Sequence, residues 1–317
     1  MRKLIATASL CLVSAVVSAQ QYPNKPIRLI VPFPPGGAAE LGARVFAQPL
    51  GQALGQPVII ETRPGADGAI ASDAVMKAAP DGYTLYYGTA TGLSWLPAMR
   101  KTPPYDPVAD FTPISLVGIF GFFVFSHASM PVYTLGDLVG YARANPGRLN
   151  YGTGNATSIL ATGQFAAQQN LNMAHIPYKG DGPLSLDLVG GRLHVAIATP
   201  GTLAPQVKEG KLRVLATLLP SRSPLLPDAP TLAEAGFPSI PITPWGGLFG
   251  PAKLPKEVVD RVARDLAAVL KRPEVKEGFG RLAFEARSST PQQLTAFVVE
   301  QLEAYKQVAR SLGINPE

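Results

Sequence analysis

Short apolar runs alternate with longer amphipathic segments along the first third of the chain. Ile27–Phe33, Val58–Ile60 and Tyr83–Gly88 have the length and branching of buried strands. Helices are expected between them, over Ala39–Leu54 and from about Ala69 to Ala79. Strands that alternate with helices at this spacing predict βαβ units and a mostly parallel sheet.

Pro49 lies well inside the first predicted helix, whose apolar face carries Leu41, Val45 and Phe46. Proline removes one backbone hydrogen bond and clashes with the preceding turn. We therefore expect a kink or an early end of this helix at Pro49.

The alternating pattern restarts in the middle of the chain, after a long apolar run. That run, Ile114–Phe125, is long enough to cross from one lobe to another, and Gly247–Gly250 is a second candidate crossing strand. Residues 220–244 are rich in proline and are expected to form a surface connection. The other elements expected here are the strands Asn150–Tyr151, Leu193–Ala198 and Leu212–Leu218 and the helices Leu135–Ala144, Thr157–Asn170, Lys256–Lys271 and Pro291–Leu312.

The first nineteen residues have the layout of a secretory signal peptide. Arg2 and Lys3 form a basic start, Leu4–Val17 is an apolar run, and Val17-Ser18-Ala19 offers a small-residue cleavage site. The alternative is an N-terminal membrane anchor, for which the apolar run is short. We predict a protein that is exported to the periplasm.

Cleavage at this site changes both the charge and the cysteine content. The formal charge of +6, less the two charges of Arg2 and Lys3, leaves +4, which mildly favours anionic ligands. Cys11, the only cysteine, is also removed, so the mature chain can form neither a disulfide nor a thiolate metal site. Arg and Lys residues are scattered along the chain, which argues against a nucleic-acid partner.

Three glycine-containing turns each follow a predicted strand and precede a predicted helix: Pro35–Ala39, Gly65–Gly68 and Gly152–Ser158. Glycine lets the backbone approach a ligand closely, and the first N–H groups of a helix have no partner within it. Together with the positive end of the helix dipole, these donors form an anion site. Glycine is also common in such connections for steric reasons alone. Two of these turns from different halves of the chain would form a clamp if they faced each other.

Other chemistries have little support in the sequence. Gly152–Thr157 begins like a dinucleotide-binding fingerprint, but Thr157 replaces its third glycine and no acidic residue lies near position 172 to hold a ribose. The chain has no G-x-S-x-G nucleophile motif. His127, His175 and His194 match no metal-ligand spacing, and we interpret them as structural residues. We predict no catalytic residue, no metal and no cofactor, although a serine, a histidine and an acid could still converge in space.

Five aromatic residues lie near predicted strand ends or near the crossings. They are Phe33, Trp95, Phe120, Phe122 and Trp245. Aromatic side chains at such positions pack into a core more often than they line a pocket, and the sequence leaves both roles open.

Several motifs resemble those of the Bug proteins, the extracytoplasmic solute receptors of tripartite tricarboxylate transporters. The likeness starts at Tyr22–Gly37 and continues in order down the whole mature chain. Further matches are Leu54–Val58, Arg63–Ala66, Ala79–Leu85, Pro104–Pro107, Leu149–Gly152, Ile176–Gly180 and Pro230–Gly236. In this order and behind a signal peptide, these motifs are highly specific.

The resemblance implies an α/β, two-lobed periplasmic binding fold, similar to type II, in which two βαβ domains are joined by two crossing strands. We expect residues 20–122 plus 244–317 in the first lobe and residues 123–243 in the second. The resemblance also implies an organic acid ligand, held largely by backbone N–H groups and ordered waters from loops of both lobes. The ligand-binding residues expected on this basis are Phe33, Pro35, Gly36, Gly37, Ala38, Ala39, Glu40, Thr89, Thr91, Gly92, Thr153, Gly154, Asn155, Thr157, Ser158, Ala198 and Thr199.

Three departures from the family pattern bear on specificity. Glu40 stands where the family commonly has Asp, and Ala198 lies in a segment that usually has Asp or Asn near its end. Leu93 and Leu96 stand where His and Asn are common. These changes predict a less polar pocket, and hence an organic acid with an apolar or aromatic body in preference to an amino acid or a hydroxylated tricarboxylate.

The function predicted from the sequence is capture of a small organic carboxylate by closure of two lobes, followed by docking on the membrane permease subunits of a transporter. We expect a monomer that catalyses nothing. One alternative is a ligand sensor that signals to a membrane kinase, and another is a secreted hydrolase on the same fold.

Overall fold

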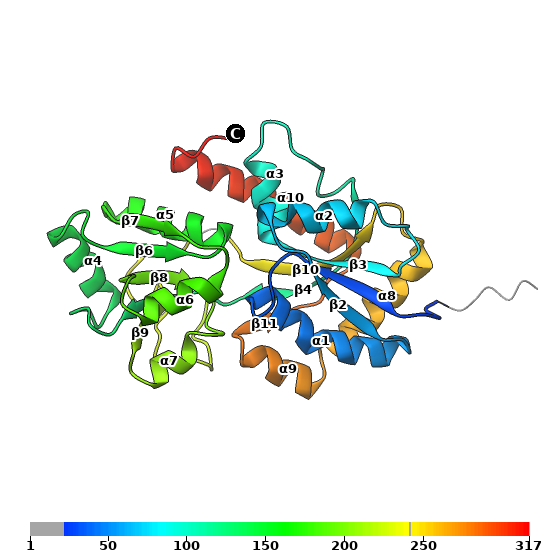
Figure 1. The fold of residues 1–317 in the computed structure, drawn as a ribbon, viewed down its shortest axis with the longest axis horizontal. Helices are drawn as coiled ribbons and strands as arrows, with labels where there is room; N and C mark the ends of the chain where they lie inside the picture. Colours follow the sequence, from blue (N-terminus) through cyan, green and yellow to red (C-terminus); the bar gives the residue numbers. More distant parts are fainter. Residues whose placement is uncertain (1–21, 241, 317) are drawn as a thin grey trace, which may run out of the picture.

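The computed structural model describes residues 22–240 and 242–316, which form two lobes, each built around one β-sheet (Figure 1). The second lobe, coloured green, lies at the left of this view. The predicted signal peptide, residues 1–19, lies outside the described residues.

The first lobe contains a six-stranded sheet in the order β11-β4-β10-β3-β1-β2. Its strands are β1 (Ile27–Val31), β2 (Val58–Thr62), β3 (Thr84–Thr89), β4 (Phe111–Phe120), β10 (Trp245–Pro251) and β11 (Phe284–Ala286). Its helices are α1 (Ala38–Leu54), the 3₁₀ turn η1 (Ala66–Gly68), α2 (Ala69–Met76), the π-helical turn η2 (Thr91–Trp95), α3 (Leu96–Ala98), α8 (Lys256–Val269), α9 (Pro273–Gly280) and α10 (Pro291–Ser311).

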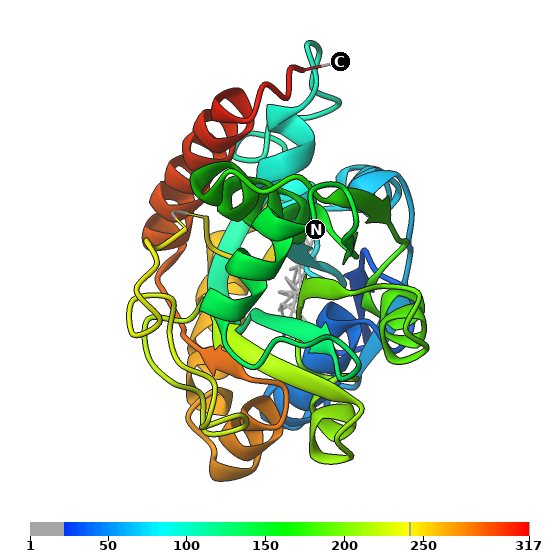
Figure 2. The same ribbon diagram turned by 90° about the vertical axis from the view of Figure 1, so that its left-hand side faces the viewer.

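The second lobe contains a five-stranded sheet in the order β7-β6-β8-β5-β9. Its strands are β5 (Phe123–His127), β6 (Asn150–Thr153), β7 (Ala174–Pro177), β8 (Val195–Ala198) and β9 (Leu212–Thr217). Its helices are α4 (Leu135–Ala144), α5 (Ala156–Gln169), α6 (Asp181–Val189) and α7 (Ala204–Lys208). Figure 2 shows this lobe from its own side.

Both sheets are mixed, whereas the sequence pattern predicted mostly parallel strands. β1 is parallel to β2 and β3, and β6 is parallel to β7 and β8. β10 and β5, the strands that follow the two crossings, are antiparallel to their neighbours. The reason is that a strand arriving from the other lobe enters its sheet at the edge between the lobes. It therefore runs away from that edge, while β1, β3, β6 and β8 run towards it.

The two crossing segments are hydrogen-bonded to the strands beside them and to each other. The first crossing is the pair Gly121–Phe122, so the long apolar run splits into β4 and β5. Phe120 N–H donates to Pro244 O at 2.8 Å, and Leu218 N–H donates to Phe122 O at 2.8 Å. The prediction that Gly247–Gly250 forms the second crossing is wrong, because these residues lie inside β10 of the first sheet. The chain returns instead through the connection between β9 and β10.

Pro49 does not end the first helix, so the early end that the sequence prediction allowed is wrong. α1 continues without a break to Leu54 and ends at Gly55 in a left-handed conformation. The residues around the proline, among them Phe46, Leu50 and Leu54, are buried in the core of the first lobe. Burial of this apolar face offsets the hydrogen bond that the proline cannot make.

The last helix lies against both lobes. Leu294 and Val298 bury the first half of α10 in the first lobe. Further along, the side chain of Leu312 reaches the backbone of α5 at Gly163, where a Cβ atom would lie only 2.9 Å from Leu312 Cδ1. Figures 1 and 2 both place this helix, coloured red, beside α5.

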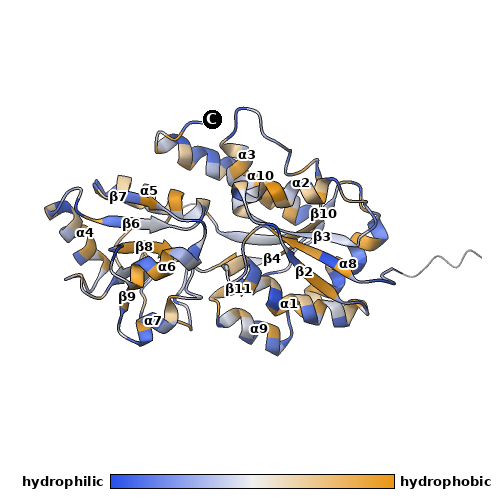
Figure 3. Cartoon of the chain, in the orientation of Figure 1, coloured by the Kyte–Doolittle hydropathy of each residue, from blue (hydrophilic) through white to orange (hydrophobic). Residues whose placement is uncertain are grey.

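The hydropathy colouring shows apolar residues on strands such as β2 and β8, whereas β6 and β10 are hydrophilic or pale (Figure 3). Ile27, Leu29, Ile30 and Val31 of β1 are completely buried. Within the described ranges, no helix has the length and apolar character to cross a membrane.

Two glycine-to-alanine substitutions test how tightly the first sheet is packed. A Cβ atom at Gly118 in β4 would lie 2.1 Å from Glu285 O in β11, whereas a Cβ atom at the exposed Gly140 in α4 would meet nothing within 4 Å. We expect Gly118→Ala to lower the free energy of unfolding by about 1–3 kcal/mol through overpacking. Gly140→Ala should raise it by about 0.5–1 kcal/mol, because alanine favours a helix interior. Urea unfolding of both variants measures this; equal effects would contradict the described packing of β11 on β4.

Candidate functional site

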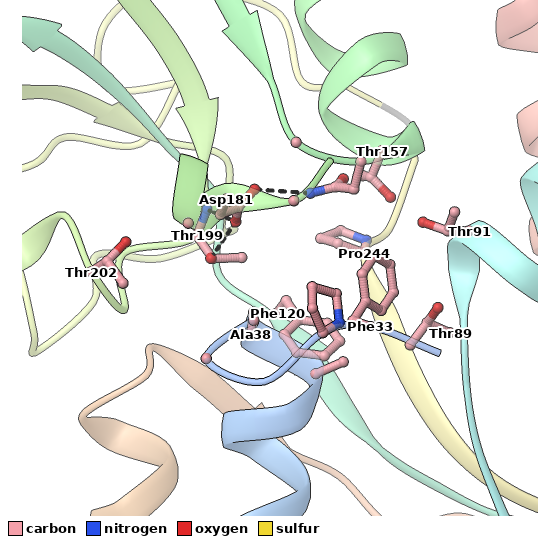
Figure 4. Close-up of a pocket in the computed structure, with 18 of the residues that line it drawn as sticks. Phe33, Ala38, Thr89, Thr91, Phe120, Thr157, Asp181, Thr199, Thr202 and Pro244 are labelled. Carbon is pink, nitrogen blue, oxygen red and sulfur yellow. Dashed lines mark hydrogen bonds between the residues drawn. The ribbon is translucent and has the colours of Figure 1, made fainter. Parts of the chain in front are cut away.

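A cavity of about 460 Å³ opens between the two lobes (Figure 4). The first lobe lines it with residues 33–39 after β1, residues 89–91 at the end of β3, and residues at or next to the crossings. The second lobe lines it with the loops that precede α5, α6 and α7. In both sheets these are loops at the carboxyl ends of parallel strands, the usual place of a binding site in α/β proteins.

Most of the residues predicted to bind ligand line this cavity, and they come from both lobes. Phe33, Thr89 and Thr91 lie on one side of the cavity in Figure 4, and Thr199 lies across it. The predicted residues that line the cavity are Phe33, Pro35, Gly36, Gly37, Ala38, Ala39, Thr89, Thr91, Gly154, Asn155, Thr157 and Thr199.

Five predicted residues lie behind the cavity wall instead: Glu40, Gly92, Thr153, Ser158 and Ala198. Gly92 O accepts from Tyr105 O–H at 2.7 Å, and Thr153 Oγ1 lies 2.7 Å from His175 Nε2. Ala198 is buried in β8 opposite Phe123. These residues shape the loops without facing the cavity.

At the start of α1, two of the predicted backbone donors are already used within the loop. Gly37 N–H donates to Pro34 O at 3.1 Å, and Gly36 N–H donates to Glu40 Oε2 at 3.0 Å. Both glycine donors are therefore already occupied within the loop. The next amides, those of Ala38 and Ala39, belong to the first turn of α1, where no side chain caps the helix. Because first-turn amides have no acceptor inside a helix, these two are the open main-chain donors of α1 that border the cavity.

The start of α5 forms a second open helix end in the other lobe. Asn155 and Ser158 form a capping box, in which Ser158 N–H donates to Asn155 Oδ1 at 3.0 Å and Asn155 N–H donates to Ser158 Oγ at 3.2 Å. This box satisfies the third amide of the helix and leaves the amides of Ala156 and Thr157. Two helix N-termini, one from each lobe, therefore border one cavity, which is an arrangement suited to an anion.

The buried carboxylate of Glu40 does not leave a bare negative charge next to this anion site. It accepts from Gly36 N–H and forms an ion pair with Arg44, one turn further along α1. Its negative charge in the first turn also interacts favourably with the positive end of the helix dipole. Its charge is therefore balanced by its neighbours.

Asp181 was not among the predicted ligand-binding residues. It is a central polar residue on the side of the cavity that the second lobe forms. Its Oδ2 accepts from Thr199 Oγ1–H at 2.5 Å and from Thr199 N–H at 3.2 Å, and its Oδ1 accepts from Asn155 Nδ2 at 3.4 Å. Figure 4 shows these bonds linking three loops. Burial raises the pKa of Asp181 above its ordinary value, and the hydrogen bonds offset this only in part. The helix that Asp181 begins was not predicted, so its position at a loop-to-helix junction went unnoticed.

Gly154 has a packing role beside Asp181. A Cβ atom at this position would lie 2.2 Å from Asp181 Oδ1 and 2.8 Å from Asp181 N. Only glycine lets the two loops approach this closely, so a larger residue here would displace Asp181 and its hydrogen bonds.

The first lobe and the crossings make the opposite wall of the cavity apolar. Phe33, Phe120, Phe122 and Trp245, for which the sequence left two roles open, all line it, together with Pro244. Trp95 does not. Among the described residues, Thr89 Oγ1 and Trp245 Nε1 are buried polar atoms without a hydrogen-bond partner. Lys179 is the one cationic side chain among the described lining residues.

The departures used to predict a less polar pocket do not act through the cavity wall. Leu93 and Leu96 are core residues of the first lobe, and Ala198 faces the core of the second. The apolar wall comes instead from the aromatic and proline residues above.

The third glycine turn and the histidines also lie elsewhere. Gly68 packs against Pro32 and Gly92, outside the cavity lining. His194 Nδ1 accepts from Asn150 N–H at 2.9 Å, and the His175 ring stacks on Tyr151. In the part of the chain that the structure describes, no three His, Cys, Asp or Glu residues gather as metal ligands would.

Comparisons with known proteins match nearly the whole chain. Residues 42–314 match the family described as tripartite tricarboxylate transporter family receptor. The chain is 34% identical to BugT of Bordetella pertussis over 316 residues, which covers 98% of this chain and 95% of that protein. An R. palustris protein solved with adipate is 32% identical with a TM-score of 0.88 and covers 93% of this chain and 100% of its own. MatC from Rhodopseudomonas palustris, solved with bound malate, is 26% identical with a TM-score of 0.82 and covers 90% and 99%.

Asp181→Asn should remove a pH-dependent cost of folding. Because the folded-state pKa of Asp181 lies above the ordinary 3.8, the folded protein keeps this proton at pH values where the unfolded chain has lost it. The contribution of Asp181 to the free energy of unfolding is thus constant below the ordinary pKa. It falls as the pH rises towards the folded-state pKa and then levels off. We expect the difference between wild type and variant, from urea unfolding at a series of pH values, to decline over this interval; a difference that grows with pH would contradict it.

Proposed function

Because this chain belongs to the tripartite tricarboxylate transporter receptor family, we propose that it is a periplasmic solute-binding protein that captures a small organic carboxylate for a membrane transporter. The observation that carries this proposal is the pair of open helix N-termini, α1 and α5, that border one interlobe cavity. Such amides and dipoles favour a negatively charged group without any catalytic side chain.

The proposed mechanism is closure of the lobes around the ligand. Amides of Ala38 and Ala39 from the first lobe and of Ala156 and Thr157 from the second donate to one carboxylate. Each hydrogen bond to a charged acceptor contributes about 1.5–3 kcal/mol. The ligand favours the closed form because only that form brings both sets of donors to it. The lobes move as bodies of residues 20–122 plus 244–317 and residues 123–243, and they pivot at the two crossings.

We infer that the rest of the ligand is predominantly apolar. Phe33, Phe120, Phe122 and Pro244 offer a hydrocarbon surface, which favours burial of an aliphatic or aromatic body. Thr89 and Trp245 line the cavity with one unpartnered but buried donor each, Oγ1 and Nε1, and a small shift of this wall on closure would let them donate to one further polar group of the ligand. A diacid with a methylene chain, such as the adipate of the R. palustris relative, has this combination of features.

The remaining parts of the proposal concern the protein's surroundings. Residues 1–19 direct export, the mature chain acts as a monomer that catalyses nothing, and the closed form docks on the permease subunits. Support comes from the family and from the basic, apolar, small-residue order of the N-terminus.

Calorimetric titration with benzoate, adipate, malate, glutamate and citrate tests the ligand class. We expect benzoate or adipate to bind most tightly, because each buries a hydrocarbon body against the aromatic wall. Tight binding of glutamate or citrate alone would contradict the apolar-body inference. Failure of every carboxylate to bind would contradict the proposed function.

A proline at the first position of α1 tests the amide donors directly. Ala38→Pro removes one N–H and keeps the helix start, since proline is favoured at this position and Gly37 already has a compatible extended conformation. We expect the Kd for the carboxylate to rise about 10- to 100-fold, which corresponds to the loss of one charge-assisted hydrogen bond.

The matched control is Lys256→Pro, at the exposed first position of α8 and far from the cavity lining. It makes the same backbone change, and we expect it to leave the Kd unchanged. Equal Kd values for wild type, Ala38→Pro and Lys256→Pro would show that the α1 amides do not hold the ligand.

A further inference from the structure

A buried hydrogen bond joins the C-terminal helix to the anion site of the other lobe. Tyr305 OH on α10 lies 2.6 Å from Thr157 Oγ1, although the two residues are 148 positions apart. Tyr305 is completely buried, and Thr157 is 3% exposed. Thr157 lines the cavity and belongs to the first turn of α5, whereas Tyr305 does not line it. The phenol therefore stands directly behind a residue of the proposed site.

We propose that Tyr305 is a positioning residue for the carboxylate: its O–H donates to Thr157 Oγ1, so that the hydroxyl hydrogen of Thr157 is free to donate to the bound anion. This inference rests on the proposed function. It adds the hydroxyl group of Thr157 to the amide donors of α5. The direction of that hydroxyl group is set by α10, a helix outside the cavity.

The proton count of the two hydroxyl groups supports this direction. Each group has one hydrogen and can both donate and accept. If Thr157 donated to Tyr305, it would have no hydrogen left for a ligand. If Tyr305 donates, the Thr157 hydrogen is available, and a carboxylate is a stronger acceptor than a neutral oxygen. The competing acceptor for the phenol, Thr243 O, lies at 3.4 Å and is the weaker partner.

The surroundings of Tyr305 fix its position. Gln301, one turn earlier on α10, accepts from Thr243 N–H at 3.2 Å, which ties the helix to the second crossing segment. Leu294 and Val298 bury the same helix face in the first lobe. Burial also raises the pKa of Tyr305, so the phenol keeps its hydrogen. Tyr305 is therefore held in one position within the first lobe, where it meets Thr157 in the closed form.

The test combines single and double substitutions with calorimetric titration of adipate and benzoate. Tyr305→Phe removes only the hydroxyl group and should raise the Kd about tenfold. Thr157→Val removes the proposed donor and should weaken binding at least as much. Adding Tyr305→Phe to Thr157→Val should then change the Kd by less than about twofold, because the phenol acts through Thr157. Thr157→Ser keeps a hydroxyl group and should retain affinity within about threefold.

Tyr87→Phe is the matched control. Tyr87 is also a fully buried tyrosine of the first lobe, and its OH has no hydrogen-bond partner in the described part of the chain. Tyr87 does not line the cavity, so we expect the Kd of Tyr87→Phe for the carboxylate to equal that of the wild type. Thermal unfolding without ligand separates loss of stability from loss of affinity.

Two results would overturn the inference while leaving the proposed function intact. One is a Kd for Tyr305→Phe equal to that of wild type and Tyr87→Phe. The other is an effect of Tyr305→Phe that persists undiminished in Thr157→Val. A wild-type protein that binds no carboxylate would instead overturn the proposed function, and this inference with it.

Discussion

The first N–H groups of a helix need acceptors from outside the helix. In both lobes, such N–H groups remain available at the border of the interlobe cavity. In each lobe a strand runs to the interlobe edge and leads directly into a helix, β1 into α1 and β6 into α5. The mixed sheets follow from the same layout, since strands that arrive from the other lobe must run in the opposite direction. The crossing segments, bonded to each other at Phe122 and Leu218, hold the two edges opposite one another.

Two buried carboxylates, Glu40 and Asp181, lie next to the anion site, and each is held by neighbouring hydrogen-bond donors. Glu40 is balanced by Arg44 and by a backbone N–H, and it stiffens the loop before α1. Asp181 has a raised pKa and three donors, and it ties together the loops that contain Asn155 and Thr199. Both acids organise the backbone around the cavity and leave the amides to face it.

The resemblance to the Bug receptors predicted the two lobes and the loops that meet at the cavity, whereas glycine, proline and apolar runs marked the strand ends and helix starts. The individual donors could not be predicted in the same way. Which amide remains open depends on hydrogen bonds within the loop, such as that from Gly36 to Glu40, and one-dimensional patterns do not reveal them. Asp181 and Tyr305 were missed for a related reason: their roles arise from contacts with residues 18 or more positions away. The role of Gly247–Gly250 was wrong because glycine content alone does not distinguish a crossing from a central strand packed against Tyr87.

The scarcity of charged side chains around the cavity has a consequence for the conditions under which such a receptor works. Apart from Lys179, the donors that the described residues offer are neutral main-chain and hydroxyl groups, which have no protonation equilibrium near neutral pH. Salt screens exposed charge pairs far more than short, partly buried hydrogen bonds. A compartment outside the inner membrane shares the acidity and ionic strength of the cell's environment. In a binding site of this composition, most of the donors to an organic acid therefore keep the same charge as that environment changes.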